Sequence, residues 1–248
     1  MSEKINLKIL RQDSPDSKPY WETFTLEASP DTNVISLLMD IQKKPINANG
    51  KHVAPVVWEC NCLEHVCGSC SMIINGKVQQ ACNALIKTVG TNITLKPMSK
   101  FPVLRDLRVD RTKLFDNLKK VKAWIPVDGY YDLGAGPRIA PEEQLLNYEL
   151  SRCMSCGCCL DACPNVNHRS EYMGAAVMAQ VVLFNAHPTG KLHQSMRLEQ
   201  VIGVGGIVDC GNSQNCAEVC PKELPLIEAI AELNKQTTKW GFFGSLKW

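Results

Sequence analysis

The sequence contains the stretch Cys62-Leu63-Glu64-His65-Val66-Cys67-Gly68-Ser69-Cys70, which places three cysteines within nine residues. The whole chain of 248 residues has thirteen cysteines. Its N-terminus, MSEKINLKIL, alternates polar and apolar residues as a strand does, and has neither a signal-peptide core nor an Arg-rich transit helix. We therefore expect the chain to stay in the reducing compartment where it is made, where many cysteines indicate metal binding rather than disulfides.

The spacing of this first cysteine group is typical of a plant-type 2Fe-2S site: Cys62-x4-Cys67-x2-Cys70, then eleven residues and Cys82. Four thiolates must meet at such a cluster, so a tight loop supplies three of them and a neighbouring strand returns the fourth. Gly68 would let backbone amides approach the sulfurs, and hydrogen bonds to sulfur tune the reduction potential. A zinc site is the alternative, but zinc usually takes paired C-x2-C units, which this group lacks.

Two more potential ligands lie in or beside this loop. Cys60 is expected to be a small buried side chain, because the set of four thiols is complete without it. His65 is expected to be an exposed loop residue, because Rieske centres replace two cysteines with two histidines. We expect neither residue to bind iron.

Two later cysteine runs form an internal repeat. The first run has the spacing of two-cluster bacterial ferredoxins: Cys153-x2-Cys156-x2-Cys159-x3-Cys163-Pro164. The second run has the same offsets, with a serine at its second position: Cys210, Ser213, Cys216, Cys220 and Pro221. Cys158 falls off this register and is expected to be a buried non-ligand. The repeat predicts two clusters with one thiolate missing.

In such paired runs the first three cysteines bind one cluster and the fourth cysteine reaches the other. This cross-ligation assigns a 4Fe-4S cluster to Cys153, Cys156, Cys159 and Cys220. It leaves three thiolates, which suit a 3Fe-4S cluster: Cys163, Cys210 and Cys216. A serine-ligated 4Fe-4S cluster stays open as the alternative, because an alkoxide can bind iron. The non-cysteine residues predicted to lie beside the clusters are Ser213, Pro164, Pro221 and Gly68.

The secondary-structure pattern changes between the first and second cysteine groups. Strands are predicted early in the chain by alternating apolar residues such as Ile5, Leu7 and Ile9, by Phe24 and Leu26, and by the hairpin turn Asn75-Gly76. One early helix is predicted over residues 34–42, with Asp31 or Thr32 as its cap. Later residues predict helices that begin at Pro141 or span 173–185 and 226–235.

This change predicts an α+β protein of two domains. We expect a 2Fe-2S ferredoxin domain over residues 1–105 and a helical two-cluster domain over residues 139–248. The linker between them is placed at residues 106–138, because residues 130–137 are rich in turn formers.

The composition excludes several classes of protein. Apolar residues make up 45% of the chain and charged residues 21%, which is close to the average of soluble proteins. The net charge of +2 gives no sign of a nucleic-acid partner. The most apolar stretch, residues 175–184, is shorter than the roughly 18 residues that a membrane-spanning helix needs. No nucleophile with a base and an orienting group stands out, and residues 203–206 predict a helix stop rather than a phosphate loop. We therefore predict no catalytic residue in this chain.

Together the three motifs resemble the iron-sulfur subunit of succinate dehydrogenases and fumarate reductases along nearly the whole chain. The resemblance is carried by residues 62–70, 153–159 and 210–221. It implies a β-grasp 2Fe-2S ferredoxin domain followed by an all-α ferredoxin domain. It also implies a complex with an FAD-containing flavoprotein that oxidises succinate and a membrane anchor with cytochrome b haem that handles quinone. Electrons would pass from flavin through the 2Fe-2S, 4Fe-4S and 3Fe-4S clusters to that anchor, at the cytoplasmic face of a bacterial membrane.

One part of the sequence departs from many of these relatives. Those that bind quinone near the 3Fe-4S cluster often carry tryptophan shortly after the proline of the second run, and histidine after the first cysteine of the third. This chain has Asn165-Val166-Asn167-His168 and Gly211 at those places. It resembles the Gram-positive, menaquinone-linked branch, whose two-haem anchor could take the electrons directly. His168 is expected at the surface.

The last residues of the chain are rich in aromatic side chains. Trp240, Phe242, Phe243 and Trp248 are expected to help dock this tail near the membrane anchor, because aromatic residues favour such interfaces. A frayed tail is the alternative at a chain terminus.

Three other classes of protein would use similar motifs. Free ferredoxins are usually short and acidic, whereas this chain is long and near neutral. A structural zinc protein would be colourless, whereas an iron-sulfur protein is brown. A subunit of a thiol-linked fumarate reductase would normally add further cysteine-rich repeats, and none follows Cys220.

Overall fold

The computed structural model describes residues 2–125 and 138–243. Its contacts divide the chain into two compact units, and each unit is built from two separate segments. Unit 1 comprises residues 1–111 and 154–161, and unit 2 comprises residues 112–153 and 162–248. Residues 126–137 of the expected linker, like Trp248 of the expected docking tail, lie outside the described residues. The domain boundaries at 105 and 139 therefore stay predictions.

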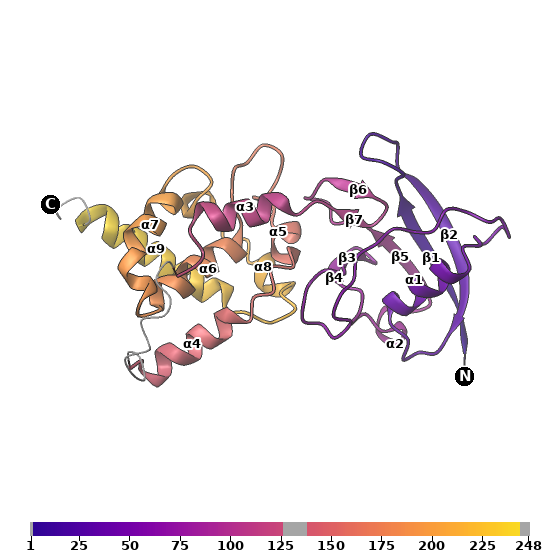
Figure 1. Cartoon of the computed structure of the whole chain (residues 1–248), viewed down its shortest axis with the longest axis horizontal. Helices are drawn as coiled ribbons and strands as arrows, with labels where there is room; N and C mark the ends of the chain where they lie inside the picture. Colours follow the sequence, from indigo (N-terminus) through magenta and orange to yellow (C-terminus); the bar gives the residue numbers. More distant parts are fainter. Residues whose placement is uncertain (1, 126–137, 244–248) are drawn as a thin grey trace. The chain divides into compact units, whose positions relative to one another are not determined.

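Unit 1 is built on a five-stranded mixed sheet with the strand order β2-β1-β5-β3-β4 (Figure 1). Its strands are β1 (Glu3–Arg11), β2 (Tyr20–Ala28), β3 (Ser71–Ile74), β4 (Lys77–Gln80) and β5 (Asn92–Lys96). Strand β1 pairs antiparallel with β2 and parallel with β5, while β3 pairs antiparallel with both β4 and β5. The remaining elements are α1 (Val34–Lys43), α2 (Ile86–Val89), β6 (Val103–Arg105) and β7 (Arg108–Val109). The predicted β-grasp ferredoxin fold is confirmed.

The alternating pattern of β1 places one face of this strand in the core. Ile5, Leu7 and Ile9 are fully buried, and the residues between them are exposed. They belong to one core cluster with Leu37 and Leu38 of α1. Burying such an aliphatic side chain contributes about 1.5–3 kcal/mol. The core therefore holds the helix against the sheet, as the periodicity predicts.

Helix α1 begins one residue after its cap, and the cap differs from the expected one. Neither Asp31 nor Thr32 caps the helix; Asn33 does, because its Oδ1 accepts the N–H of Ser36 at 2.9 Å. The amide of Asn33 also donates to the carbonyl of Cys82 at 3.0 Å. The choice of cap thus depends on a tertiary contact, and that contact holds Cys82 in place.

The predicted turn at Asn75-Gly76 joins β3 to β4. Its two residues have φ values of 49° and 84°, and a two-residue hairpin needs such positive angles. The Thr94 N–H donates to Asn75 Oδ1 at 2.7 Å, which fixes the turn to β5. After the hairpin, the N–H of Ala81 donates to the carbonyl of Cys70 at 3.1 Å. The hairpin thus returns the chain to the first cysteine loop.

A buried ion pair fixes the segment that leads into this loop. Arg11 donates to both carboxylate oxygens of Asp106, at 2.8 and 3.2 Å, and to Glu22 at 2.6 Å. The Val57 N–H donates to Asp106 at 2.8 Å, and Arg11 donates to the carbonyl of Pro55 at 3.3 Å. Because the pair is buried, the loss of one partner would leave an uncompensated charge in the core.

Unit 2 is helical (Figure 1). Its longer elements are α3 (Thr112–Lys120), α4 (Pro141–Ser151), α6 (Ala175–Ala186), α7 (Gln194–Ile202) and α9 (Leu226–Phe243). Its short elements are η2 (Gly190–His193), η3 (Ile207–Asp209) and α8 (Asn215–Glu218), and α5 (Cys158–Ala162) ends in this unit. Helix α6 is largely buried and contacts α3, α4, α7, η2 and α9. Among the described residues, no helix is both long and apolar enough to cross a membrane.

The helix boundaries of unit 2 follow the predictions at some ends and differ at others. Pro141 begins α4, and α7 stops at Gly203, both as predicted. The helix expected from Met173 begins only at Ala175, after Gly174 with its positive φ. Helix α9 continues well past the expected end at residue 235, because its later part packs against other helices: Gln236 accepts a hydrogen bond from α6, and Thr237 is buried. These tertiary contacts are invisible to local periodicity.

A buried arginine holds the chain after α3 against the helices of unit 2. Arg197 is fully buried and donates to the carbonyls of Lys122, Trp124 and Gly190, at 3.0, 2.8 and 2.7 Å. It also donates to Asn185 at 3.3 Å. Burial lowers the pKa of this guanidinium, and the carbonyls replace the water that it loses.

Candidate iron-sulfur sites

The first predicted site is a loop whose backbone amides point at one sulfur. Cys62 Sγ accepts the N–H groups of Glu64, Val66 and Cys67, at 3.4, 3.3 and 3.3 Å. In return, the Cys62 N–H donates to Cys67 Sγ at 3.5 Å. Hydrogen bonds to sulfur stabilise the negative charge of a thiolate and of a cluster bound to it.

Two residues with left-handed backbone conformation help to turn the N–H groups of this loop toward the sulfur of Cys62. Leu63 and His65 have φ values of 60° and 59°, which residues with a side chain adopt rarely. Successive N–H groups in such a conformation form a concave site for negative charge. Leu63 is exposed, so the core does not require this strained backbone. We attribute it to the sulfur that the amides surround.

The other thiols of the first group lie near one another. Burial opposes ionisation of Cys67, but hydrogen bonds with Ser69 and Cys62 outweigh burial and lower the pKa of the Cys67 thiol to about 6. Burial raises the pKa of Cys70, whose thiol lies beside that of Cys82. These proton equilibria would end when iron binds, since a coordinating thiol is deprotonated. The structure thus places all four predicted ligands of the 2Fe-2S cluster around one loop.

Two expectations about this loop are wrong. Cys60 is exposed instead of buried, whereas each of the four predicted ligands is at least partly buried. His65 is half-buried instead of exposed, because its left-handed backbone belongs to the folded turn.

Gly68 lies where the second cysteine run meets this loop within unit 1. Its φ is +74°, and a Cβ atom on Gly68 would come within 2.6 Å of Cys156 Cβ. Only glycine leaves room for this approach. The sequence predicted a glycine that admits amides to sulfur, and the structure adds a steric reason for the same residue.

Arg111 clamps the same two segments, and no sequence motif pointed to it. Its guanidinium donates to the carbonyls of Gly68, Ser69 and Cys156, at 3.0, 3.3 and 3.4 Å. It also pairs with Glu59 at 3.2 Å. Arg111 lies inside the range predicted as linker, so periodicity gave no reason to single it out. Its fixed positive charge lies next to both cysteine segments.

Cys158 is buried, as expected, and it joins a polar cluster. Gln80 donates to Ser71 Oγ at 3.0 Å and to Cys158 Sγ at 3.4 Å, and Cys158 Sγ lies 3.7 Å from Ser71 Oγ. Hydrogen bonds from Cys158, and then from Gln80, lower the pKa of Cys156 to about 7. The hydrogen bond with the Cys156 thiol, and then burial, raise the pKa of Cys158 itself. Of these two thiols, Cys156, the predicted ligand, therefore ionises more easily than Cys158.

The structure divides the second predicted ligand set between the two units. Cys156 and Cys159 belong to unit 1, and Cys153 and Cys220 belong to unit 2. Within residues 2–125 and 138–243, no three His, Cys, Asp or Glu side chains are arranged to hold a single metal ion. The set of four thiols for a 4Fe-4S cluster stays a prediction.

The third predicted ligand set lies around one small pocket in unit 2. Its described lining includes all three predicted thiols and the serine that replaces a cysteine: Cys163, Cys210, Cys216 and Ser213. The rest of the lining is uncharged: Asn165, Tyr172, Ala175, Gly211, Asn212, Gln214, Ile227 and Ile230. Burial raises the pKa of Cys216. Pro164 is exposed and Pro221 is half-buried, and neither is part of this described lining.

Asparagine side chains tie together the segments that carry these thiols. Asn165 donates to the carbonyl of Asp209 at 2.8 Å, and Asn215 donates to the carbonyl of Ala162 at 3.1 Å. A Cβ atom on Gly211 would lie 2.8 Å from Asn165 Oδ1. Asn165 and Gly211, which both lie where this sequence departs from many quinone-binding relatives, therefore pack against each other, and the missing side chain of Gly211 leaves room for Asn165.

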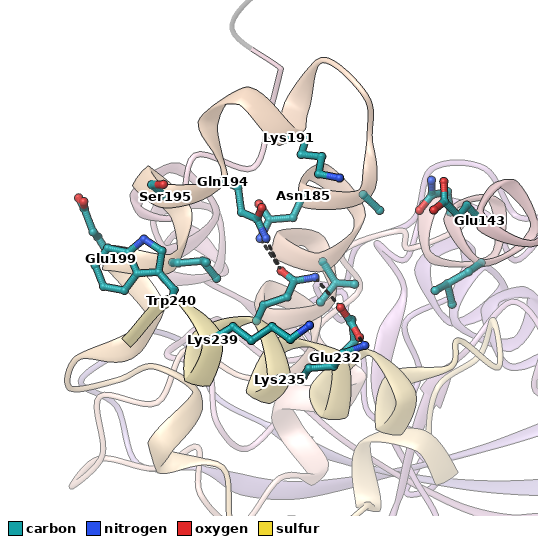
Figure 2. Close-up of a pocket in the computed structure, with 16 residues that line it drawn as sticks. Glu143, Asn185, Lys191, Gln194, Ser195, Glu199, Glu232, Lys235, Lys239 and Trp240 are labelled. Carbon is teal, nitrogen blue, oxygen red and sulfur yellow. Dashed lines mark hydrogen bonds and ion pairs between the residues drawn. The ribbon is translucent and has the colours of Figure 1, made fainter. Parts of the chain in front are cut away.

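A larger hollow in unit 2 lies between α4, α6, α7 and α9 and contains none of the predicted ligands (Figure 2). Asn185 and Gln194 donate to Gln236, at 2.9 and 3.3 Å, and Gln236 donates to Glu232 at 3.1 Å. These polar groups satisfy one another, and Asn185 also accepts from the buried Arg197. We regard this network as structural.

Two family models match the two halves of the chain. A 2Fe-2S iron-sulfur cluster binding domain matches residues 6–116. A 4Fe-4S dicluster domain matches residues 149–224. With the sheet, the helices and the grouped thiols, these matches define an electron-carrying protein with two ferredoxin-type domains.

Comparison with known proteins then narrows this class. The chain is 56% identical over 250 residues to the succinate dehydrogenase iron-sulfur subunit of Bacillus subtilis, with 99% of each chain covered. It is 30% identical to the fumarate reductase iron-sulfur subunit of Wolinella succinogenes, with 95% of this chain and 98% of that one covered. In fold it is similar to a chain of the Mycobacterium smegmatis Sdh1 complex in the apo form, with a TM-score of 0.79, 20% identity and 98% of each chain covered.

This chain belongs to the family of succinate dehydrogenase iron-sulfur subunits. It is an electron-transfer subunit with a 2Fe-2S and a 4Fe-4S cluster domain. The cysteine thiols described above fit iron-sulfur clusters, because soft thiolates favour iron-sulfur chemistry and backbone amides surround the sulfur of Cys62.

Proposed function

We propose that this chain relays single electrons from an FAD-containing flavoprotein subunit through three clusters to a membrane anchor and quinone. The 2Fe-2S cluster is held by Cys62, Cys67, Cys70 and Cys82. The 4Fe-4S cluster is held by Cys153, Cys156, Cys159 and Cys220. The 3Fe-4S cluster is held by Cys163, Cys210 and Cys216, with Ser213 at its vacant corner.

The observation that carries this proposal is the pocket that Cys163, Cys210, Cys216 and Ser213 line together. These residues come from the two halves of the internal repeat, and the spacing of the two runs predicts this pairing of the halves. Three thiols and one hydroxyl in one pocket support a cluster with three thiolate ligands. A pairing of each run with itself would instead have grouped Cys163 with Cys153.

Bound clusters supply one-electron steps, whereas flavin takes up two electrons at once. The residues of this chain provide the thiolates, aim N–H groups at sulfur and bury two thiols of the third pocket, those of Cys163 and Cys216. We propose that no residue of this chain acts on succinate. The purified subunit alone should therefore not oxidise succinate, and activity without the flavoprotein would contradict the proposal.

Ser213 gives the sharpest test of the ligand assignment. In the purified complex, Ser213→Cys should supply a fourth thiolate and turn an oxidised, EPR-active 3Fe-4S cluster into an EPR-silent 4Fe-4S cluster with one more iron. The matched variant Ser213→Ala should keep the 3Fe-4S signal and the iron content of the wild type. If serine instead holds a fourth iron, the wild type will be silent and Ser213→Ala will gain the signal. An unchanged signal and iron content in Ser213→Cys would show that the two runs are paired wrongly.

We further propose that the anchor carries cytochrome b haem, that the subunit sits peripherally at the cytoplasmic face of a bacterial membrane, and that the quinone is menaquinone. Phe242 is 72% exposed near the end of α9, which supports an aromatic contact with the anchor. Truncation before residue 240 should weaken retention of the subunit on membranes, whereas Phe115→Ala on α3 should not. Retention equal to the wild type would reject docking by the tail.

Parallel assays of succinate-dependent reduction of menaquinone and ubiquinone analogues test which quinone the complex uses.

A further inference from the structure

Tyr172 carries a buried hydroxyl group without a hydrogen-bond partner. Its side chain is 3% exposed, and no described atom reaches its Oη with hydrogen-bond geometry. Tyr172 lines the pocket of Cys163, Cys210 and Cys216. A buried hydroxyl without an acceptor costs free energy, so its presence beside three thiols needs an explanation.

The backbone on both sides of Tyr172 is fixed, so the side chain cannot easily turn toward water. The Tyr172 N–H donates to Ser170 Oγ at 3.1 Å, and the Met173 N–H donates to the carbonyl of Gly205 at 2.9 Å. Gly205 in turn donates to Asp209 Oδ2 at 2.6 Å, one residue before Cys210. The segment of Tyr172 is therefore held against the segment of Cys210.

Gly205 and Asp209 tie the segment of Tyr172 to the segment of Cys210, so Cys210 is the pocket thiol that we take as the acceptor. Burial raises the pKa of the Tyr172 phenol, so the hydroxyl keeps its proton and can donate it. A neutral thiol is a weak acceptor, whereas a thiolate bound to iron carries negative charge and accepts a hydrogen bond well. Binding of a cluster in this pocket would thus turn the sulfur of Cys210 into the hydrogen-bond acceptor that the Tyr172 hydroxyl lacks.

We propose that Tyr172 Oη donates a hydrogen bond to the iron-bound sulfur of Cys210 and thereby raises the reduction potential of the cluster in this pocket. The proposal rests on the ligand assignment given under Proposed function. Reduction adds one negative charge to the cluster, and a donor at its sulfur stabilises that form more than the oxidised form. Tyr172 would thus favour acceptance of an electron at the last carrier of the chain.

The primary test is a redox titration of the purified complex followed by the EPR signal of this cluster. Tyr172→Phe removes one oxygen atom and should change the ratio of oxidised to reduced cluster at a fixed potential by about tenfold toward oxidised, or about 59 mV for a one-electron couple. Tyr148→Phe makes the same change at a tyrosine that is 62% exposed on α4, and its titration should match the wild type. A Tyr172→Phe titration that overlays the wild type would overturn the proposal.

A second measurement separates a hydrogen bond from general disturbance of the pocket. Pulsed EPR of the oxidised cluster in H2O and D2O should detect an exchangeable proton in the wild type and in Tyr148→Phe, and this coupling should be missing in Tyr172→Phe. Incorporation of difluorotyrosine at position 172 keeps the shape but makes the phenol a stronger donor, so the ratio should move the opposite way, toward reduced. A shift in the same direction as Tyr172→Phe would overturn the proposal even if that variant loads poorly.

The ligand assignment has a separate test. Cys210→Ala should remove or convert the cluster of this pocket and leave the 2Fe-2S signal intact. If all three clusters remain in Cys210→Ala, the assignment fails. If Cys210→Ala loses the cluster but Tyr172→Phe changes nothing, only the role of Tyr172 fails.

Discussion

The Cys62 loop and the pocket of Cys163, Cys210 and Cys216 hold the same kind of ligand in different surroundings. In the loop, three backbone N–H groups donate to one sulfur and the edge of the site is exposed. In the pocket, the other lining side chains are uncharged, and one of them is the buried phenol of Tyr172. The loop stabilises charge with its backbone, which substitutions cannot delete, whereas the pocket depends on a side chain. The potential of the pocket should therefore be easier to change by substitution, and that of the loop should depend on what holds its backbone.

The largest expected effect concerns the buried ion pair that supports the loop. Asp106→Ala removes the fully buried partner of Arg11, which keeps its contact with Glu22, and should lower the free energy of unfolding by about 3–5 kcal/mol. Chemical unfolding measures this loss, and EPR should show depleted 2Fe-2S signal with the signal of the third pocket retained. Asp31→Ala breaks an exposed pair with Lys87 and serves as the control. Equal losses in the two variants would contradict the role given to burial.

A smaller loss is expected from Gly68→Ala. The new methyl group would overlap Cys156, which costs about 1–3 kcal/mol, and the left-handed backbone adds about 1–2 kcal/mol. Gly76→Ala has a similar φ of +84° with open space around it, so it reports the backbone cost alone. The comparison is measured by the unfolding free energy and by 2Fe-2S content. If Gly76→Ala lowers the unfolding free energy and the 2Fe-2S content as much as Gly68→Ala does, the close approach of Cys156 is not the reason why position 68 requires glycine.

Arg111→Gln should have the smallest effect, on potential rather than stability. Its charge stabilises the reduced cluster of the loop, so its removal should lower the 2Fe-2S potential by less than about 59 mV, since water screens part of the charge. Arg108→Gln removes the other arginine that pairs with Glu59; among the described contacts it is Arg111 that binds the carbonyls of Gly68 and Cys156, so Arg108→Gln should shift the potential less. Redox titration followed by EPR compares them. The third pocket should keep its potential in both variants.

Cysteine spacing predicted which residues of the third pocket lie together, because cluster chemistry fixes the number of thiolates and their offsets. Alternation predicted β1, and the turn chemistry of Asn75-Gly76 predicted the hairpin. These signals are local or dictated by the cofactor. They do not depend on how distant segments pack.

What the sequence did not predict was decided by packing. Asp31, Thr32 and Asn33 can all cap a helix, and the carbonyl of Cys82 favours Asn33. Arg111 and Tyr172 act through contacts with segments far away in the chain, and neither belongs to a motif. The exposure of Cys60 follows from the fold of its loop. Such choices need tertiary structure.

The two-segment composition of unit 1 has a consequence for dissection of the gene. Residues 154–161 belong to the sheet unit, where Gly157 packs so closely on Phe101 that a Cβ atom would lie 2.8 Å from the ring. A gene fragment that stops anywhere in residues 106–138 would encode the sheet without this piece, and would leave Phe101 and Gln80 uncovered. A gene fragment that keeps these contacts would therefore encode residues 154–161 as well, for example through a fused linker after residue 111.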